Sequence, residues 1–148
     1  MRKAFVIISA LLLVSFALQF VFAAVGAFTK PAADDSYALH SVNGMAVIPV
    51  LTLLTALFAA LAKAPGRLVA LALLPLGLVV VQALIAMLAR AATDAAGVST
   101  PLGLIIGGLH AVNGIIAVHV VVGVHQAARR LTAPVATADL PVRPGAPV

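Results

Sequence analysis

The sequence contains no cysteine, which removes every function that depends on a thiol. Disulfide bonds, thiolate metal sites and thiol-linked haem attachment are all excluded, so any cofactor must be held by other side chains. Charge is scarce as well, because Asp, Glu, Lys and Arg together make up 9% of the 148 residues, against roughly a quarter in an average soluble domain. We therefore do not expect a soluble globular protein.

The acidic side chains are four aspartates, and all of them lie outside the apolar stretches. A small proton-coupled exporter needs an ionisable carboxylate inside the membrane, so this class has little support. The chain also lacks a Ser-His-Asp set, a glycine-rich phosphate loop and a His-Glu-x-x-His motif. No hydrolase or transferase is predicted, and we assign no catalytic residue.

Apolar residues make up 64% of the chain, and its mean hydropathy is +1.21. They form four runs, at about 4–28, 37–61, 68–89 and 102–126, each near the roughly 20 residues that cross a bilayer as a helix. The first run exceeds the roughly 7–15 residues of a signal-peptide core, so we expect it to be retained. The prediction is an all-α integral membrane protein, an up-down four-helix bundle over residues 1–130, followed by a disordered, proline-rich cytoplasmic tail over 131–148.

Basic residues gather at one end of the apolar runs. One side has seven of them and the other has Lys30 and Arg90; the seven are Arg2, Lys3, Lys63, Arg67, Arg129, Arg130 and Arg143. By the positive-inside rule both termini are cytoplasmic, in a multi-pass protein of the plasma membrane, here a bacterial inner membrane. The net charge of +5 is scattered and has no interleaved aromatics, so nucleic acid is not an expected partner.

One phrase, LHxVNG, occurs twice, at residues 39–44 and again at 109–114. One span upstream of each phrase lies a glutamine, Gln19 in the first half and Gln82 in the second. Each half therefore consists of one helix with a polar amide followed by one helix with His-x-x-Asn-Gly. The bundle is predicted to be built from two such helix-pair repeats.

An intramembrane histidine is costly and usually functional, so the repeated pair His40 and His110 is the predicted centre of the protein. The second and fourth spans run in the same direction and are diagonal in an up-down bundle, a separation at which two imidazoles can ligate one haem. We predict a single b-type haem there, used for electron transfer, storage or hand-over, with a redox or respiratory protein of the membrane as partner. Depth agrees only to about one turn, since His40 lies 23 residues before Lys63 and His110 lies 19 before Arg129.

Neighbouring residues complete the predicted haem site. Glycines four positions after each histidine would leave room for a flat macrocycle, because positions four apart stack on one helix face. Asparagines three positions after each histidine, together with the two glutamines, could orient the imidazoles as hydrogen-bond partners. The predicted set is Gln19, His40, Asn43, Gly44, Gln82, His110, Asn113 and Gly114, with His40 and His110 as axial ligands of the haem iron.

Two alternatives remain open. The first is a cofactor-free membrane scaffold or accessory subunit, in which the same side chains are interhelical polar contacts of about 0.6 kcal/mol each. The second is quinone, proton or other metal chemistry at the same pair. The remaining histidines do not join the site: His119 lies on the opposite helix face, and His125 is expected at the membrane interface. Gly103-x-x-x-Gly107 could support a homodimer, and Pro49 and Pro75 are expected kinks.

The order Gln-x-x-x-small, then His-x-x-x-small, is similar to the repeating unit of haem A synthase, an eight-span protein whose four-helix halves each hold a haem site. The chain also resembles small bacterial four-span membrane proteins with paired LHxxNG phrases. These resemblances imply that His40 and His110 are axial ligands. The synthase pattern also contains a glutamate and an arginine, whereas Ser41 and Ala111 follow the histidines here. The resemblance therefore extends to haem ligation and not to the synthase reaction.

Overall fold

The structure is a computed structural model that describes residues 1–31, 33 and 35–133. These residues form helices and no strand, and four helices are long and apolar enough to cross a membrane. Helix α1 is Arg2–Phe28, α4 is Gly66–Ala91 and α5 is Pro101–Thr132. The second span consists of α2 (Ala38–Val42), a π-helical turn η1 (Asn43–Val47) and α3 (Ile48–Leu61).

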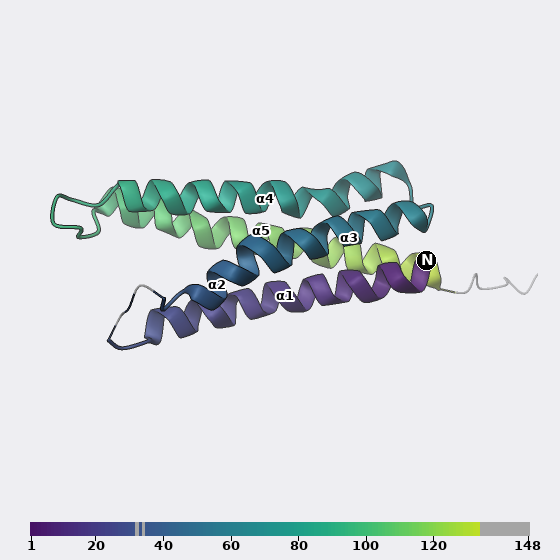
Figure 1. The fold of residues 1–148 in the computed structure, drawn as a ribbon. Helices are drawn as coiled ribbons and strands as arrows, with labels where there is room; N and C mark the ends of the chain where they lie inside the picture. Colours follow the sequence, from purple (N-terminus) through teal and green to yellow (C-terminus); the bar gives the residue numbers. More distant parts are fainter. Residues whose placement is uncertain (32, 34, 134–148) are drawn as a thin grey trace, which may run out of the picture.

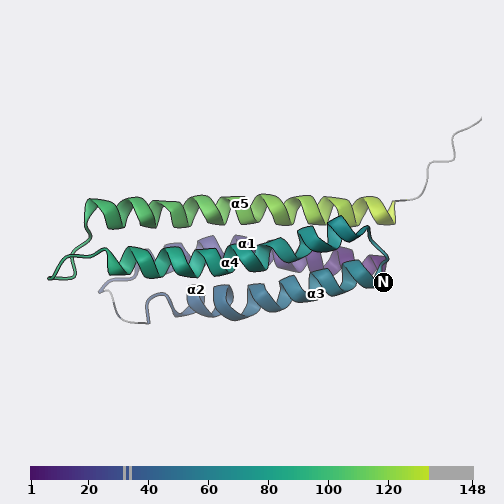
Figure 2. The same ribbon diagram turned by 90° about the horizontal axis from the view of Figure 1, so that it is seen from above.

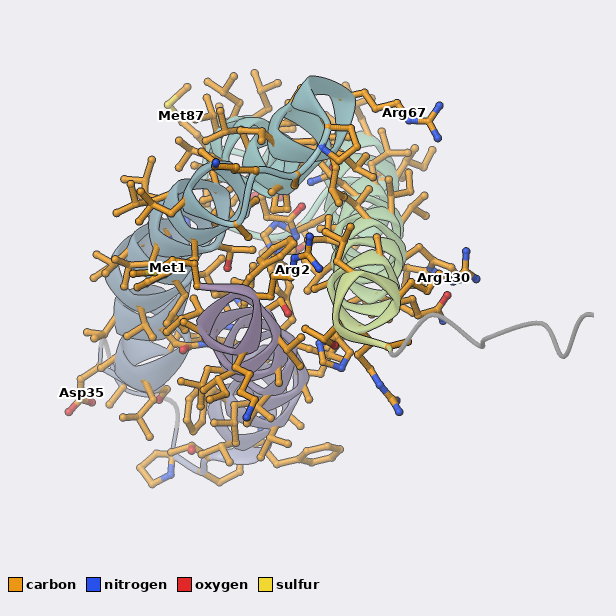
Figure 3. The ribbon with its side chains drawn as sticks, turned by 90° about the vertical axis from the view of Figure 1, so that its right-hand side faces the viewer. Met1, Arg2, Asp35, Arg67, Met87 and Arg130 are labelled. Carbon is orange, nitrogen blue, oxygen red and sulfur yellow. The ribbon has the colours of Figure 1, made fainter. Side chains whose placement is uncertain are left out.

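The four spans run alternately up and down, side by side (Figures 1 and 2). Viewed along the bundle, they form a square in which α1 and α4 each pack against both α3 and α5 (Figure 3). Helices α3 and α5 therefore occupy opposite corners, as expected for alternate spans of an up-down bundle. The N-terminus, the turn between α3 and α4 and the end of α5 lie at one end of the bundle.

Two clusters of buried side chains hold the bundle together. The cluster near the N-terminus of α1 is built around Phe5 and small residues such as Ala59 and Ala128, which let the helices approach closely. The second cluster, near the middle, contains Leu12, Phe16, Ile48, Ala117 and Val121. Many large apolar side chains remain on the outside of the bundle, where a bilayer would cover them. Neither cluster reaches the loops that precede α2 and α5, because the members nearest those loops are Phe16, Ile48 and Ala117.

Local signals place the helix ends close to the predicted positions. Thr100 is the N-cap of α5, where its hydroxyl accepts a hydrogen bond from the backbone N–H of Gly103 at 3.1 Å, and Pro101 is the first helical residue. Helix α5 continues to Thr132, beyond the predicted end of this span at 126, and it includes the first residues assigned to the tail. Its last turns contain good helix formers, and Leu131 packs against the core. The rest of the predicted tail, 134–148, lies outside the described residues.

The two intramembrane prolines differ in their effect on the helices. Proline has no N–H, so Pro49 cannot pair with the carbonyl four residues earlier, that of Met45. The π-helical turn Asn43–Val47 lies just before this proline, and a π-helix shifts each backbone bond by one residue. This turn begins three residues after His40. Pro75, by contrast, is buried inside α4, and the helix continues through it.

Candidate functional site

The first repeat forms a hydrogen-bonded unit that links α1 to the start of the second span. The amide Nε2 of Gln19 donates to the backbone carbonyl of His40 at 3.0 Å. Asn43 Nδ2 donates to Gln19 Oε1 at 2.7 Å and to the carbonyl of Ser15 at 3.0 Å, and the Ser15 hydroxyl donates back to Asn43 Oδ1 at 2.8 Å. Asn43 is 6% exposed, so it is buried at the contact between the two helices. Every polar atom of these amides therefore has a partner on the other helix.

The second repeat reproduces these connections between α4 and α5, except for the hydroxyl bond of Ser15, whose equivalent position is Leu78. Gln82 Nε2 donates to the backbone carbonyl of His110 at 2.7 Å. Asn113 Nδ2 donates to Gln82 Oε1 and, at 2.9 Å, to the carbonyl of Leu78. Leu78 precedes Gln82 by four residues, as Ser15 precedes Gln19. The duplicated sequence therefore encodes a duplicated helix clamp, in which glutamine holds the histidine backbone and asparagine holds the glutamine.

The two units differ at the histidine ring. His40 is held at both ring nitrogens, since Nδ1 lies 3.1 Å from the carbonyl oxygen of Gln19 and Nε2 lies 3.2 Å from Gln19 Nε2. Tyr37 also meets this ring edge to face, with centroids 6.3 Å apart. The ring of His110 has no such support, and its Nδ1 is buried without a hydrogen-bond partner among the described residues. The pair therefore combines one restrained imidazole with one whose ring is not fixed by hydrogen bonds.

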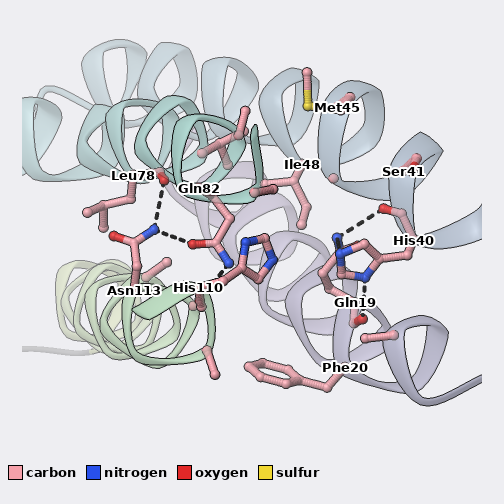
Figure 4. A pocket seen from close by; sticks show the side chains of 18 of the residues that line it. Gln19, Phe20, His40, Ser41, Met45, Ile48, Leu78, Gln82, His110 and Asn113 are labelled. Atoms are coloured by element: carbon pink, nitrogen blue, oxygen red, sulfur yellow. Dashed lines mark hydrogen bonds between the residues drawn. The ribbon is translucent and has the colours of Figure 1, made fainter. Parts of the chain in front are cut away.

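The two histidine rings lie close together in the interior of the bundle. Their ring centroids are 6.1 Å apart and their planes are inclined by 40°. They line a cavity of about 470 Å³ between the α1–α2 pair and the α4–α5 pair (Figure 4). This volume is within the roughly 300–1,000 Å³ typical of small-molecule sites. Apart from the histidines and amides the lining is largely apolar, with Phe20, Ile48 and Leu78 among the walls.

The predicted site residues come together, but not all of them have the predicted surroundings. Asn43 does not line the cavity, whereas the other seven do. A Cβ on Gly44 would lie 2.7 Å from Gln19 Nε2, so this glycine makes room for the amide of the clamp. The corresponding distance from Gly114 to Gln82 Nε2 is 3.6 Å, an ordinary contact. Gly44 therefore has a second role beside the predicted one, and the space that both glycines would clear for a macrocycle stays a prediction.

Several cavity residues do not stand out in the sequence. Tyr37, Phe20 and Arg90 all line the cavity, although the charge pattern marks Arg90 only as an indicator of orientation. A signal for Arg90 does exist, because Gln82, Ala86 and Arg90 are spaced by four and therefore share one helix face. All three line the cavity.

The other two histidines lie away from the cavity. His119 is exposed on α5, and its Nδ1 lies 2.9 Å from the carbonyl oxygen of Ile115. His125 is expected at the interface, but its Nδ1 is 3.0 Å from the hydroxyl of the fully buried Ser9, so it joins α5 to α1. Gly103 packs against backbone carbonyls of Ala89 and Ala92, which places the start of the GxxxG face inside the bundle. No group of three or more His, Cys, Asp or Glu side chains that could hold a metal ion occurs among the described residues.

Comparison with known proteins gives one match. Residues 19–92, half of the chain, match the model of a family of unknown function, DUF6220. The chain belongs to this family. The DUF6220 match begins at Gln19 and contains His40, Asn43 and Gln82, so it covers the first unit apart from Ser15 and the amide of the second. No curated protein and no solved structure matches the chain.

Proposed function

We propose that this protein binds a single b-type haem between His40 and His110 in the membrane, for electron transfer or haem handling. The observation that carries the proposal is the separation of the two rings. Two iron–nitrogen bonds of about 2.0 Å, with about 1.1 Å from each nitrogen to its ring centroid, give a centroid separation of about 6 Å. The observed separation is 6.1 Å. Both rings also border the same largely apolar cavity.

One hydrogen bond of the His40 ring, at Nδ1, favours metal ligation, and the contact between Nε2 and Gln19 Nε2 would be given up for the iron. If Nδ1–H donates to the Gln19 carbonyl, the lone pair of the neutral ring is on Nε2, which is the tautomer of a metal-bound histidine with a carbonyl partner. The unpartnered Nδ1 of His110 also supports the proposal, because a buried polar atom without a partner costs about 1–3 kcal/mol. Ligation of an iron at Nδ1 of His110 would compensate for that cost, whereas ligation at Nε2 would leave it in place.

Within this proposal the clamps act as positioning groups. Gln19 and Gln82 hold the backbone at each histidine, and their asparagine partners hold the glutamines, so the backbone positions that carry the two rings are kept at a set height and distance. A bound haem would supply one-electron chemistry, and its potential would depend on two histidine ligands and an apolar, buried surrounding. The similarity of the repeat to that of haem A synthase supports the ligand assignment. The basic residues at the end of the bundle where α1 begins and α5 ends support a cytoplasmic location for that end and favour a cavity in the outer half of the bundle.

Absorbance spectroscopy tests the proposal directly. The protein is expressed in bacterial membranes with haem precursor supplied, purified in detergent and measured before and after dithionite. We expect about one haem per chain, with a sharp band near 410–430 nm that shifts on reduction, an approximate range for histidine-ligated haem. His40→Ala and His110→Ala should each abolish the two-histidine spectrum, whereas the control His119→Ala should leave it unchanged.

Folding must be established separately, because either histidine variant could fail to assemble. Far-ultraviolet circular dichroism and gel filtration of each variant in detergent supply that check. A wild-type protein that is folded and stays colourless after expression and after addition of haem overturns the proposal. A loss of the two-histidine spectrum in His119→Ala equal to the loss in His40→Ala would also overturn it.

A cofactor-free scaffold is the second candidate, and one observation favours it. Both ring nitrogens of His40 already have partners on Gln19, so the ring is satisfied without any metal. In that case the histidines serve only as interhelical contacts of about 0.6 kcal/mol each. The protein would then be colourless under every loading condition, and His40→Ala would alter unfolding alone.

A further inference from the structure

One charged side chain borders the cavity. Arg90 is the penultimate residue of α4, at the end of the bundle where the chain turns toward α5, and it lines the same cavity as the two histidines. It lies eight residues beyond Gln82, about 12 Å along the helix. Side chains on a helix lean toward its N-terminus, and for α4 this direction leads from Arg90 back over the cavity. Arg90 is exposed and yet lines the cavity, so its side chain lies at the rim, where the cavity meets the outside of the bundle.

Arg90 has no carboxylate partner among residues 1–31, 33 and 35–133. The nearest acidic residue along the chain, Asp94, is occupied by its own loop, where Oδ1 accepts from the backbone N–H groups of Ala96 and Val98 at 2.9 and 2.8 Å. The corresponding position of the first repeat, eight residues after Gln19, is Ala27. The cationic rim is therefore a feature of one repeat only, and the duplicated clamp does not need it.

The lining of the cavity indicates what kind of ligand would use this charge. Its walls are apolar, its middle has two imidazoles, and its rim has one guanidinium, the side chain best suited to carboxylates because it offers a planar fork of donors. A ligand that fits has a flat apolar body and an acidic group at one end. We propose that Arg90 binds a porphyrin carboxylate at the outer rim of the cavity. This inference rests on the proposed function.

The test uses metal-free protoporphyrin IX and its dimethyl ester. The two compounds differ only in that the carboxyl groups are free to ionise in the acid and are methylated in the ester. Each is titrated into the haem-free protein in detergent and followed by porphyrin fluorescence. The wild type should bind the free acid about tenfold more tightly than the ester, the size expected for one charge-assisted hydrogen bond. Arg90→Gln should lower the affinity for the free acid about tenfold and leave the affinity for the ester unchanged. The affinity of Arg90→Lys for the free acid should lie between those of the wild type and Arg90→Gln.

A matched control removes a positive charge from the same end of the bundle without touching the cavity. Lys30→Gln does this, since Lys30 is exposed in the loop after α1 and does not line the cavity. It should leave the preference for the free acid intact. Equal binding of acid and ester by the wild type overturns the inference, as does a Lys30→Gln effect as large as that of Arg90→Gln, or no porphyrin binding at all.

The two proposals fail in different ways. Iron protoporphyrin is added in a parallel titration, and its absorbance reports ligation by the histidines. A wild type that discriminates acid from ester without giving a two-histidine spectrum refutes haem ligation and retains Arg90. A two-histidine spectrum without discrimination refutes Arg90 and retains ligation.

Discussion

The clamp geometry predicts that one change, glycine to alanine, has opposite effects at the two equivalent glycines. In Gly44→Ala the new methyl group would lie 2.7 Å from Gln19 Nε2, closer than side-chain contacts allow, so the amide must move. That amide takes part in three side-chain hydrogen bonds or close polar contacts, to the carbonyl and ring of His40 and to Asn43. In Gly114→Ala the nearest atom of Gln82 is 3.6 Å away, so no bond is disturbed.

The expected magnitudes follow from two opposing terms. Alanine is favoured over glycine in a helix by up to about 1 kcal/mol. Interhelical hydrogen bonds in membrane proteins contribute about 0.6 kcal/mol each, so losing three costs about 2 kcal/mol. Gly114→Ala should therefore stabilise the protein by up to about 1 kcal/mol. Gly44→Ala should destabilise it by about 1 kcal/mol, a gap of about 2 kcal/mol between equivalent positions.

The assay is reversible unfolding of the haem-free protein in mixed micelles, followed by circular dichroism as the denaturing detergent is increased. Omitting haem matters, because a ligand that binds only the folded state would add its own stabilisation. Gly77→Ala on α4 supplies the baseline, since a Cβ there meets nothing within 4 Å. In a Gln19→Ala background the clash disappears, and Gly44→Ala should then stabilise as Gly114→Ala does. If Gly44→Ala is as stabilising as Gly77→Ala in the wild-type background, the clamp geometry is wrong.

Two further predictions concern the pairing within a clamp and the orientation of the bundle. In a double-mutant cycle, Gln19→Leu and Asn43→Leu should show a coupling of about 0.6 kcal/mol and at most about 1.7 kcal/mol in unfolding free energy, and additive effects would contradict the 2.7 Å bond between these side chains. Because the chain contains no cysteine, single cysteines can report topology with a membrane-impermeant maleimide. Ser99→Cys should be labelled in intact cells and Ala64→Cys only after lysis, and the reverse pattern would invert the orientation assigned from the basic residues.

The four spans can be predicted because each depends on its own segment. Apolar length sets where a helix can cross a bilayer, and a threonine followed by a proline sets where α5 begins. The far end of α5 could not be predicted, because it depends on contacts with other segments. Residues 127–132 carry no apolar period of their own, and their helix is extended by packing of Ala128 and Leu131 against other spans.

The candidate site is likewise predictable only in part. Duplication of the LHxVNG phrase and its upstream glutamine is enough to select His40 and His110. Counting from the basic ends puts these histidines four residues, about 6 Å, apart in depth, but it does not give the separation of their rings, whose centroids lie 6.1 Å apart. Residue counts do not include the tilt of a helix or the π-helical turn between His40 and Pro49.

The sequence by itself determined the four apolar helices, the absence of thiol chemistry, and the duplicated glutamine, histidine and asparagine, because these depend on composition and on spacing within one helix. Only the tertiary structure decided what each side chain meets: Gly44 faces Gln19, His125 contacts Ser9, and Arg90 lies at the rim of the cavity. The physical reason is that helical periodicity specifies which residues share a face. The approach and rotation of neighbouring helices, set by packing over the whole bundle, specify what that face touches.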